Sequence, residues 1–259
     1  MPTPTSPRID ALRRQPLKDE VFQVLHGSIL SGQYEAGKWL RQEEISLRLG
    51  VSMTPVREAL DLLVSSGLAE RVPYRGVRVL QPSDPDILDS YEARLVLESA
   101  ATRLAAVRIQ PLQILELRAI LEDSGRWLSL DDMPRQRDLS RKLHGAIVEA
   151  CGNPLLHQMY LTALKTFPDW RLYEHLYRQP ELLHDSLRRE HSEHTMIVDA
   201  LAAADAEAAE LMALNHLFQR GRELVTYLGI PAQELERREM QAHERIRKTH
   251  LETSFKETT

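Results

Sequence analysis

The chain has 259 residues, which is enough for one or two domains. Its 33 Lys and Arg residues and 38 Asp and Glu residues give a formal charge of -5, which excludes a protein that coats nucleic acid with its whole surface but allows a local basic patch. The single cysteine, Cys151, excludes a disulfide framework and a multi-cysteine zinc site, and no apolar run approaches the ~20 residues of a membrane helix.

The first 80 residues contain the signals of three helices and a hairpin. Residues 1–16 hold four prolines, which predict a flexible arm rather than a helix. Apolar spacing and turn residues then predict helices over 17–29, 42–49 and 53–67 and strands over 68–71 and 77–80. Pro73 and Gly76 supply the turn between the strands. This order of elements predicts a winged helix-turn-helix domain over residues 17–80.

The rest of the chain reads as helical. Residues 81–85 contain two prolines and predict a linker. Breaks at Pro, Gly and Asp positions then delimit six helical segments, roughly 85–108, 112–129, 135–151, 154–177, 181–203 and 206–228. Without strand signals, residues 86–229 are predicted to form an all-α bundle of about six helices. Residues 230–259 are charge-dense, and their pattern fits either a projecting helix or a frayed tail.

The third predicted helix has the features of a DNA-reading helix. Such a helix needs small polar and basic side chains near its N-terminus on the outer face and apolar side chains on the inner face. The outer residues here are Ser52, Met53, Thr54 and Arg57, with Ser52 also placed to cap the helix. In the predicted wing, Arg71, Arg75 and Arg78 stand without an acid between them. An exposed Arg57–Asp61 pair is the structural alternative for Arg57.

At these residues the chain resembles the GntR family of bacterial transcription regulators, over about residues 17–80. The run Gly50–Leu60 and the hairpin with Gly76 carry most of the resemblance. The resemblance implies that Thr54 and Arg57 contact DNA from the recognition helix and that Arg75 reaches a groove from the wing tip. Family members often have an arginine where this chain has Met53, so a contact to guanine is replaced by an apolar one or lost.

Three histidines of the helical part lie on apolar helix faces or near them. His144 shares a face with Ile147 and Val148, His194 shares one with Ile197 and Val198, and His216 lies on a less clearly buried face. Taken singly, each fits a hydrogen-bonded core histidine. Their spacing matches no short metal-binding motif. The aromatic residues Tyr160, Phe167, Trp170, Tyr173 and Tyr177 fit core or dimer contacts for the most part, with pocket lining as the alternative for some of them.

Residues 84–228 resemble FCD, the all-α effector domain of the FadR branch of the GntR family. The matching residues are Tyr91–Arg94, Glu98, Leu143–His144, Gly152–Pro154, Glu193–His194, Ala200–Leu201, Asp205, Ala208 and His216. The resemblance implies a divalent metal, zinc or nickel, on His144, His194 and His216, with an aspartate four residues before the first histidine. Ser140 occupies that position here, so water or an effector carboxylate would complete the ligand set.

The resemblance also implies that Arg94 binds the carboxylate of an organic-acid effector, with Ser140 in the same pocket. The alternative for Arg94 is an exposed pair with Glu98 of little energetic value. Together these features predict a cytoplasmic, homodimeric transcription regulator that binds a palindromic DNA operator and no membrane. The resemblance implies a repressor, because repression is the commoner arrangement in the family.

Two other functions fit parts of the sequence. One is a DNA-binding protein whose helical domain forms dimers but binds no effector. Ser140 at the position of the family's aspartate favours this alternative. The other is a metal-dependent hydrolase with a three-histidine site and Glu190 or Glu193 as general base. The hydrolase leaves the DNA-reading helix unexplained.

Overall fold

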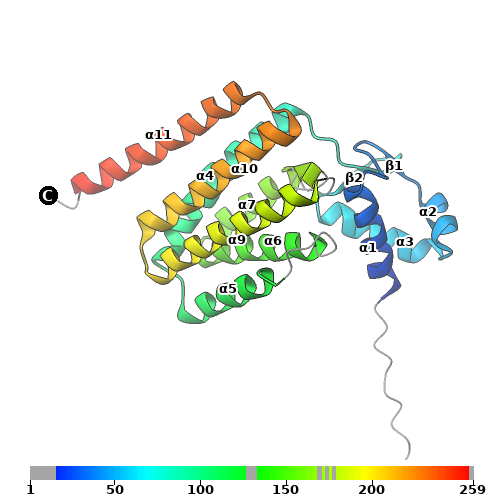
Figure 1. Cartoon of the computed structure of the whole chain (residues 1–259), viewed down its shortest axis with the longest axis horizontal. Helices are drawn as coiled ribbons and strands as arrows, with labels where there is room; N and C mark the ends of the chain where they lie inside the picture. Colours follow the sequence, from blue (N-terminus) through cyan, green and yellow to red (C-terminus); the bar gives the residue numbers. More distant parts are fainter. Residues whose placement is uncertain (1–15, 127–132, 168–170, 173–174, 177–178, 257–259) are drawn as a thin grey trace, which may run out of the picture.

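The computed structural model describes residues 16–126, 133–167, 171–172, 175–176 and 179–256. A small N-terminal domain, called the head from here on (residues 17–80), packs against one end of a long helical bundle (Figure 1). The predicted fold class, a winged helix-turn-helix followed by an all-α bundle, is confirmed. No helix among the described residues is long and apolar enough to cross a membrane.

The head contains three helices and a three-stranded antiparallel sheet. The elements are α1 (Leu17–Leu30), β1 (Trp39–Leu40), α2 (Gln42–Leu49), α3 (Met53–Ser65), β2 (Ala69–Val72) and β3 (Gly76–Val79). The strand order is β1-β3-β2, so the predicted hairpin gains a third strand that the sequence did not indicate. The hairpin turn places Tyr74 at φ 62° and Gly76 at φ 110°, and the latter value favours glycine.

An apolar core fixes the orientation of α3. Val56, Ala59, Leu60 and Leu63 are fully buried against Leu25 and Ile29 of α1. Because these residues occupy one face of α3, Met53, Thr54 and Arg57 are left on the exposed face. Ser52 does lie at the N-cap position, but its side chain makes no capping hydrogen bond. The predicted capping role of Ser52 is therefore wrong, and its hydroxyl stays exposed.

Among the described residues, the bundle has these helices: α4 (Asp84–Ala106), α5 (Pro111–Ser124), α6 (Met133–Ala150), α7 (Pro154–Thr166), α9 (Pro180–Ala202) and α10 (Ala206–Leu228). Prolines in the first turn of several helices, and caps by Ser83, Asn153 and Asp205, set the starts. Helix α4 contacts α6, α7, α9 and α10 and lies at the centre of the bundle.

The C-terminal stretch that the sequence left undecided forms a helix, α11 (Ala232–Lys256), which packs on α4. Leu235 and Ala242 are buried in this contact, and Arg238 pairs with Asp89 at 2.7 Å. The Tyr91 hydroxyl donates a hydrogen bond of 2.6 Å to Glu239. In Figure 1 this helix runs away from the head.

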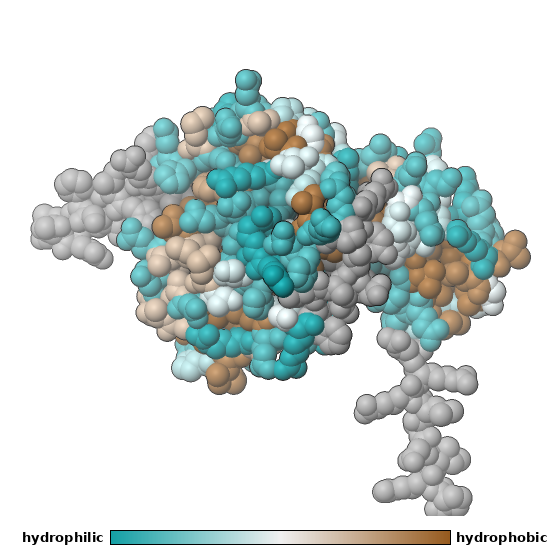
Figure 2. Space-filling view, in the orientation of Figure 1, coloured by the Kyte–Doolittle hydropathy of each residue, from teal (hydrophilic) through white to brown (hydrophobic). Residues whose placement is uncertain are grey.

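The head and the bundle share apolar and polar contacts. Leu183 and Leu187 of α9 belong to the core of the head. Helix α1 also faces α6 across a cleft of about 560 Å3, lined by His26 from α1 and by Arg141 and Lys142 from α6. Figure 2 shows a largely hydrophilic surface on the viewed face, with apolar patches on both the head and the bundle. Helix α6 therefore lies beside α1 of the head.

Candidate functional site

The outer face of α3 carries the predicted DNA-reading side chains at the protein surface. Ser52, Met53, Thr54 and Arg57 are all exposed, and Met53 retains 46% of its accessible surface. Arg57 does not pair with Asp61, because the Asp61 carboxylate accepts a bond from Arg71 of β2 instead. The structural alternative for Arg57 is thus wrong. Within the described chain Arg57 has no ion-pair partner, which leaves its guanidinium available to DNA.

The wing is less cationic than its sequence indicates. Arg71 pairs with Asp61, and Arg78 pairs with Glu70 at 2.7 Å while lying over the Trp39 ring. These two arginines hold the sheet to α3 and to β1. Arg75 stays exposed at the tip of the wing, as predicted, beside a fully exposed Tyr74. The wing therefore presents one arginine whose charge no described carboxylate neutralises.

The three histidines come together in the middle of the bundle. His144 of α6, His194 of α9 and His216 of α10 each offer one ring nitrogen, and these nitrogens lie within 4.8 Å of one another. The Nε2 atoms of His144 and His194 are 3.1 Å apart. His194 and His216 are 4% and 2% exposed. The less clearly buried face expected for His216 is therefore wrong, because α4 covers it as well.

Two carboxylates orient the rings from behind. Glu98 Oε2 lies 3.0 Å from His144 Nδ1, and Glu193 Oε2 lies 2.9 Å from His216 Nδ1. Such contacts at Nδ1 fix ring orientation and leave Nε2 to face the cluster, as in carboxylate–histidine–metal arrangements. Burial lowers the pKa of His194 to about 3 and the pKa of His216 well below its usual value. Both imidazoles are therefore neutral at neutral pH, the form that binds metals.

The pKa values of the supporting glutamates differ. Burial raises the pKa of Glu98, but Arg94 and His144 outweigh it and bring the value to about 2. Burial raises the pKa of Glu193 to about 7. The first carboxylate is therefore ionised at neutral pH, whereas the second titrates there.

A polar network surrounds the cluster. The Ser140 hydroxyl donates to Glu190 Oε1 at 3.0 Å, and Arg220 Nη1 lies 3.5 Å from Glu190 Oε2 and 3.0 Å from Glu223 Oε2. From the sequence, Arg220 has no predicted role and Glu190 is predicted only as a general base of the hydrolase alternative. A signal existed for both, because each lies four residues from a cluster histidine (His194 and His216) on the same helix face.

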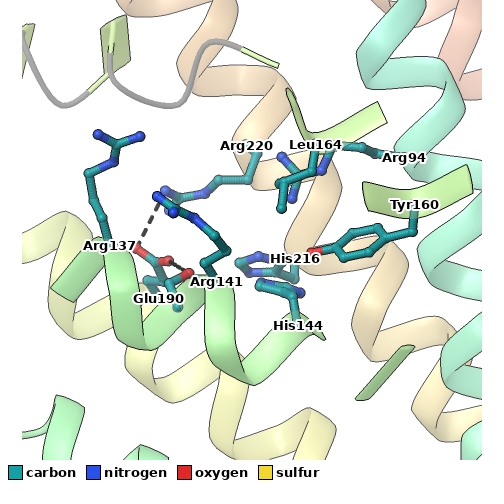
Figure 3. A pocket seen from close by; sticks show the side chains of 10 residues that line it. Arg94, Arg137, Arg141, His144, Tyr160, Leu164, Glu190, His216 and Arg220 are labelled. Atoms are coloured by element: carbon teal, nitrogen blue, oxygen red, sulfur yellow. Dashed lines mark hydrogen bonds and ion pairs between the residues drawn. The ribbon is translucent and has the colours of Figure 1, made fainter. Parts of the chain in front are cut away.

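A pocket opens onto the histidines and is unusually rich in arginine. Its walls include Arg94, Arg137, Arg141 and Arg220 together with Ser140 and Tyr160 (Figure 3). The Tyr160 hydroxyl points toward the imidazoles. The free volume is only about 20 Å3, so a ligand larger than water requires side-chain movement. The guanidinium groups can bind an anionic ligand, but Arg94 and Arg220 already pair with buried glutamates and Glu190 also lines the pocket.

Arg94 lies in this pocket and is 3% exposed. Its Nε donates to Glu98 Oε1 at 2.5 Å, and its guanidinium lies 4.5 Å from the centre of the Phe167 ring. The pair with Glu98 therefore exists, but it is buried and not the exposed pair that the alternative describes. Tyr160 and Phe167 are buried here, whereas Trp170, Tyr173 and Tyr177 lie outside the described residues.

The comparisons with known proteins agree with this two-part organisation. A family model described as "Bacterial regulatory proteins, gntR family" matches residues 17–79, and the FCD domain model matches residues 89–219. The chain belongs to the GntR family. This GntR-family chain is a DNA-binding transcription regulator, with the predicted DNA-reading residues in the first match and the histidine cluster in the second.

Relatives of this GntR-family chain are named as regulators. The uncharacterized HTH-type transcriptional regulator BphR of Paraburkholderia xenovorans (strain LB400) is 30% identical over 212 residues, 78% of this chain and 82% of the relative. The HTH-type transcriptional repressor GlaR of Escherichia coli (strain K12) is 28% identical over 201 residues, 74% of this chain and 88% of the relative. The solved structure of E. coli McbR/YncC shares the fold, with a TM-score of 0.61 at 24% identity, 82% of this chain and 99% of that one.

Proposed function

We propose that this regulator is a homodimeric repressor acting in the cytoplasm. The head (17–80), the linker (81–85) and the helical domain (86–229) are its working units, and residues 230–259 add a charged C-terminal extension. Two heads related by two-fold symmetry would read the half-sites of a palindromic operator. Ser52, Met53, Thr54 and Arg57 would face base edges, and Arg75 would reach a groove. Their exposure supports these roles.

We also propose that His144, His194 and His216 hold a divalent metal, zinc or nickel. The donor set fits: two nitrogens bound to zinc at tetrahedral angles are about 3.3 Å apart, close to the 3.1 Å between the Nε2 atoms of His144 and His194. Burial and two carboxylates at Nδ1 are the usual supports of such ligands. When bound, the metal supplies a Lewis-acid centre for an anionic ligand.

The proposed effector is a small organic acid. Arg94 and Ser140 line the pocket, and a carboxylate matches the planar fork of a guanidinium. The observation that carries this proposal is the meeting of a buried histidine cluster with four arginines in one pocket. Neither glutamate of the hydrolase alternative is free for general-base work, since Glu193 binds His216 and Glu190 binds Ser140 and Arg220.

Helix α6 offers a route from the pocket to the head. Ser140, Arg141 and His144 face the pocket, and Arg141 also lines the cleft against His26 of α1. An effector that draws Arg141 toward its carboxylate would alter this cleft and hence the placement of the head. Operator affinity would change only as far as the effector binds the two arrangements differently.

A thermal-shift screen of zinc-loaded protein tests the effector proposal. The probes are hydroxy acids, dicarboxylates and sugar acids. At 100 times its Kd a true ligand adds about 2.7 kcal/mol of stability. The double variant Arg94→Gln/Glu98→Gln replaces the buried ion pair by neutral amides and should abolish the shift. Glu98→Gln alone removes the carboxylate at His144 but keeps Arg94, and it should retain a shift. Arg118→Ala, at an exposed pair with Asp199, is the matched control. Shifts that survive in the double variant would contradict the role of Arg94.

A further inference from the structure

The histidine cluster has three nitrogen donors, and a closed tetrahedral site needs a fourth donor. Three buried carboxylates lie close enough to be considered. Glu98 and Glu193 are already engaged at the Nδ1 atoms of His144 and His216, on the far side of those rings. Glu190 is different, because its Oε1 lies 3.9 Å from His194 Nε2, the atom that faces the cluster.

The local structure holds Glu190 in this place. It lies on α9 one turn before His194, so the two side chains share a helix face. Its side chain is 8% exposed, and the Ser140 hydroxyl donates to the same Oε1 at 3.0 Å. Arg220 approaches the other oxygen, Oε2, at 3.5 Å. One carboxylate oxygen is thus anchored to a guanidinium, and the other accepts from Ser140 and lies 3.9 Å from the Nε2 atom of His194.

We propose that Glu190 is the carboxylate ligand of the metal site, with Ser140 as its positioning residue. This inference rests on the proposed metal site. The ligand set is then one carboxylate and three imidazoles, and the pair Glu190 and His194 comes from a single turn of α9. The carboxylate neutralises part of the metal charge in a buried site. An effector therefore adds a further ligand rather than completing a deficient set.

Position 140 provides a direct test, because a carboxylate placed there reaches the same space. The full-length, metal-stripped protein is titrated with Zn2+ against a chromophoric chelator, and the d–d absorption of bound Co2+ is recorded. Glu190→Gln should weaken zinc binding at least 100-fold and change the cobalt spectrum. Ser140→Ala should weaken it about 10-fold, as the loss of a ligand's hydrogen-bond partner does. Ser140→Asp in the Glu190→Gln background should recover at least 10-fold. Glu149→Gln, an exposed carboxylate on α6, is the matched control.

The outcomes separate this inference from the metal proposal itself. Wild-type zinc affinity and an unchanged cobalt spectrum in Glu190→Gln would overturn the inference and leave the three-histidine site standing. A wild-type protein that binds no zinc would overturn both. Should Glu190→Gln fail to fold, Glu190→Asp keeps the charge beside Arg220 but withdraws the oxygen by one methylene. About 10-fold weaker binding is then expected, and unchanged binding counts against the inference.

Discussion

The head and the helical bundle keep their functional side chains in opposite environments. In the head, Thr54, Arg57 and Arg75 are exposed on elements whose inner faces are apolar. In the bundle, His194 and His216 come from two different helices, and they and the glutamates beside them are almost fully buried. The difference follows from the ligands. A DNA groove is read by side chains that project into solvent, whereas a small ion or acid is held by polar groups enclosed and oriented beforehand.

The largest effect is expected from a substitution in the buried histidine cluster of the bundle. His194→Ala removes one nitrogen donor and should lower zinc affinity at least 1,000-fold, while metal-free protein keeps its DNA affinity. Chelator competition measures the first quantity and fluorescence anisotropy with a duplex the second. His157→Ala, on α7 away from the cluster, is the control. Zinc binding that survives the substitution would contradict the assignment of the site.

The apolar support of the head is tested by truncating its core. Leu60 is fully buried beneath the exposed face of α3, and Leu60→Ala should reduce the free energy of unfolding by about 2–5 kcal/mol. Urea denaturation followed by circular dichroism measures the change. Leu47→Ala removes the same atoms from a side chain that is 87% exposed and should change stability little. Equal effects of the two substitutions would show that the head is not packed as described.

DNA binding by the exposed face of α3 is predicted to depend on Arg57. Because its guanidinium has no ion-pair partner among the described residues, Arg57→Ala should leave stability unchanged and weaken specific DNA binding by about 1–3 kcal/mol, or roughly 10- to 100-fold. Anisotropy titrations at fixed salt measure the loss. Arg118→Ala on the bundle surface is the control. A loss of stability instead of affinity would place Arg57 with the structural arginines Arg71 and Arg78.

His26 probes the boundary between the two regions. Burial, followed by Arg137 and Arg141, lowers its pKa from 6.5 to about 3. Since the unfolded chain then binds the extra proton, stability should fall as the pH drops from about 6.5 toward 3, by up to about 1.4 kcal/mol per pH unit. His26→Phe should remove this part of the slope in urea denaturations at pH 7, 6 and 5. A slope identical to wild type would show that His26 is not buried between the domains.

The sequence predicted the head better than the bundle site, and the reason is the range of the interactions. Apolar spacing and Gly50, which ends α2 at φ 66°, are local signals, so the helices of the head could be located. Strand β1 has two residues and exists only through pairing with β3, which no local pattern reports. Likewise Ser52 occupies a cap position without making the bond, because backbone conformation and side-chain rotamer are set separately.

The histidine cluster depends on helix packing and not on spacing. His144, His194 and His216 lie on three helices. From the sequence, only the resemblance to FCD domains predicted that they form one site. The role of Glu98 could not be predicted for the same reason, since it acts across a helix interface. Arg220 did carry a local signal, its position four residues after His216, but its ion pair with Glu190 on another helix did not. Composition alone also overstated the positive charge of the wing. Arg71 and Arg78 pair with acids, so among the described residues only one of the three wing arginines is unpaired.

The central claim is that the exposed side chains of the head recognise DNA and that the buried site of the bundle regulates this binding. The most direct test of DNA recognition is selection of duplexes from a random pool by the full-length protein. We expect enrichment of palindromic sequences, with affinity that falls steeply as salt rises. Arg57→Ala should fail to enrich the same sequences, and the control Arg118→Ala should enrich them. Absence of any enriched sequence, or identical enrichment by Arg57→Ala, would contradict the account.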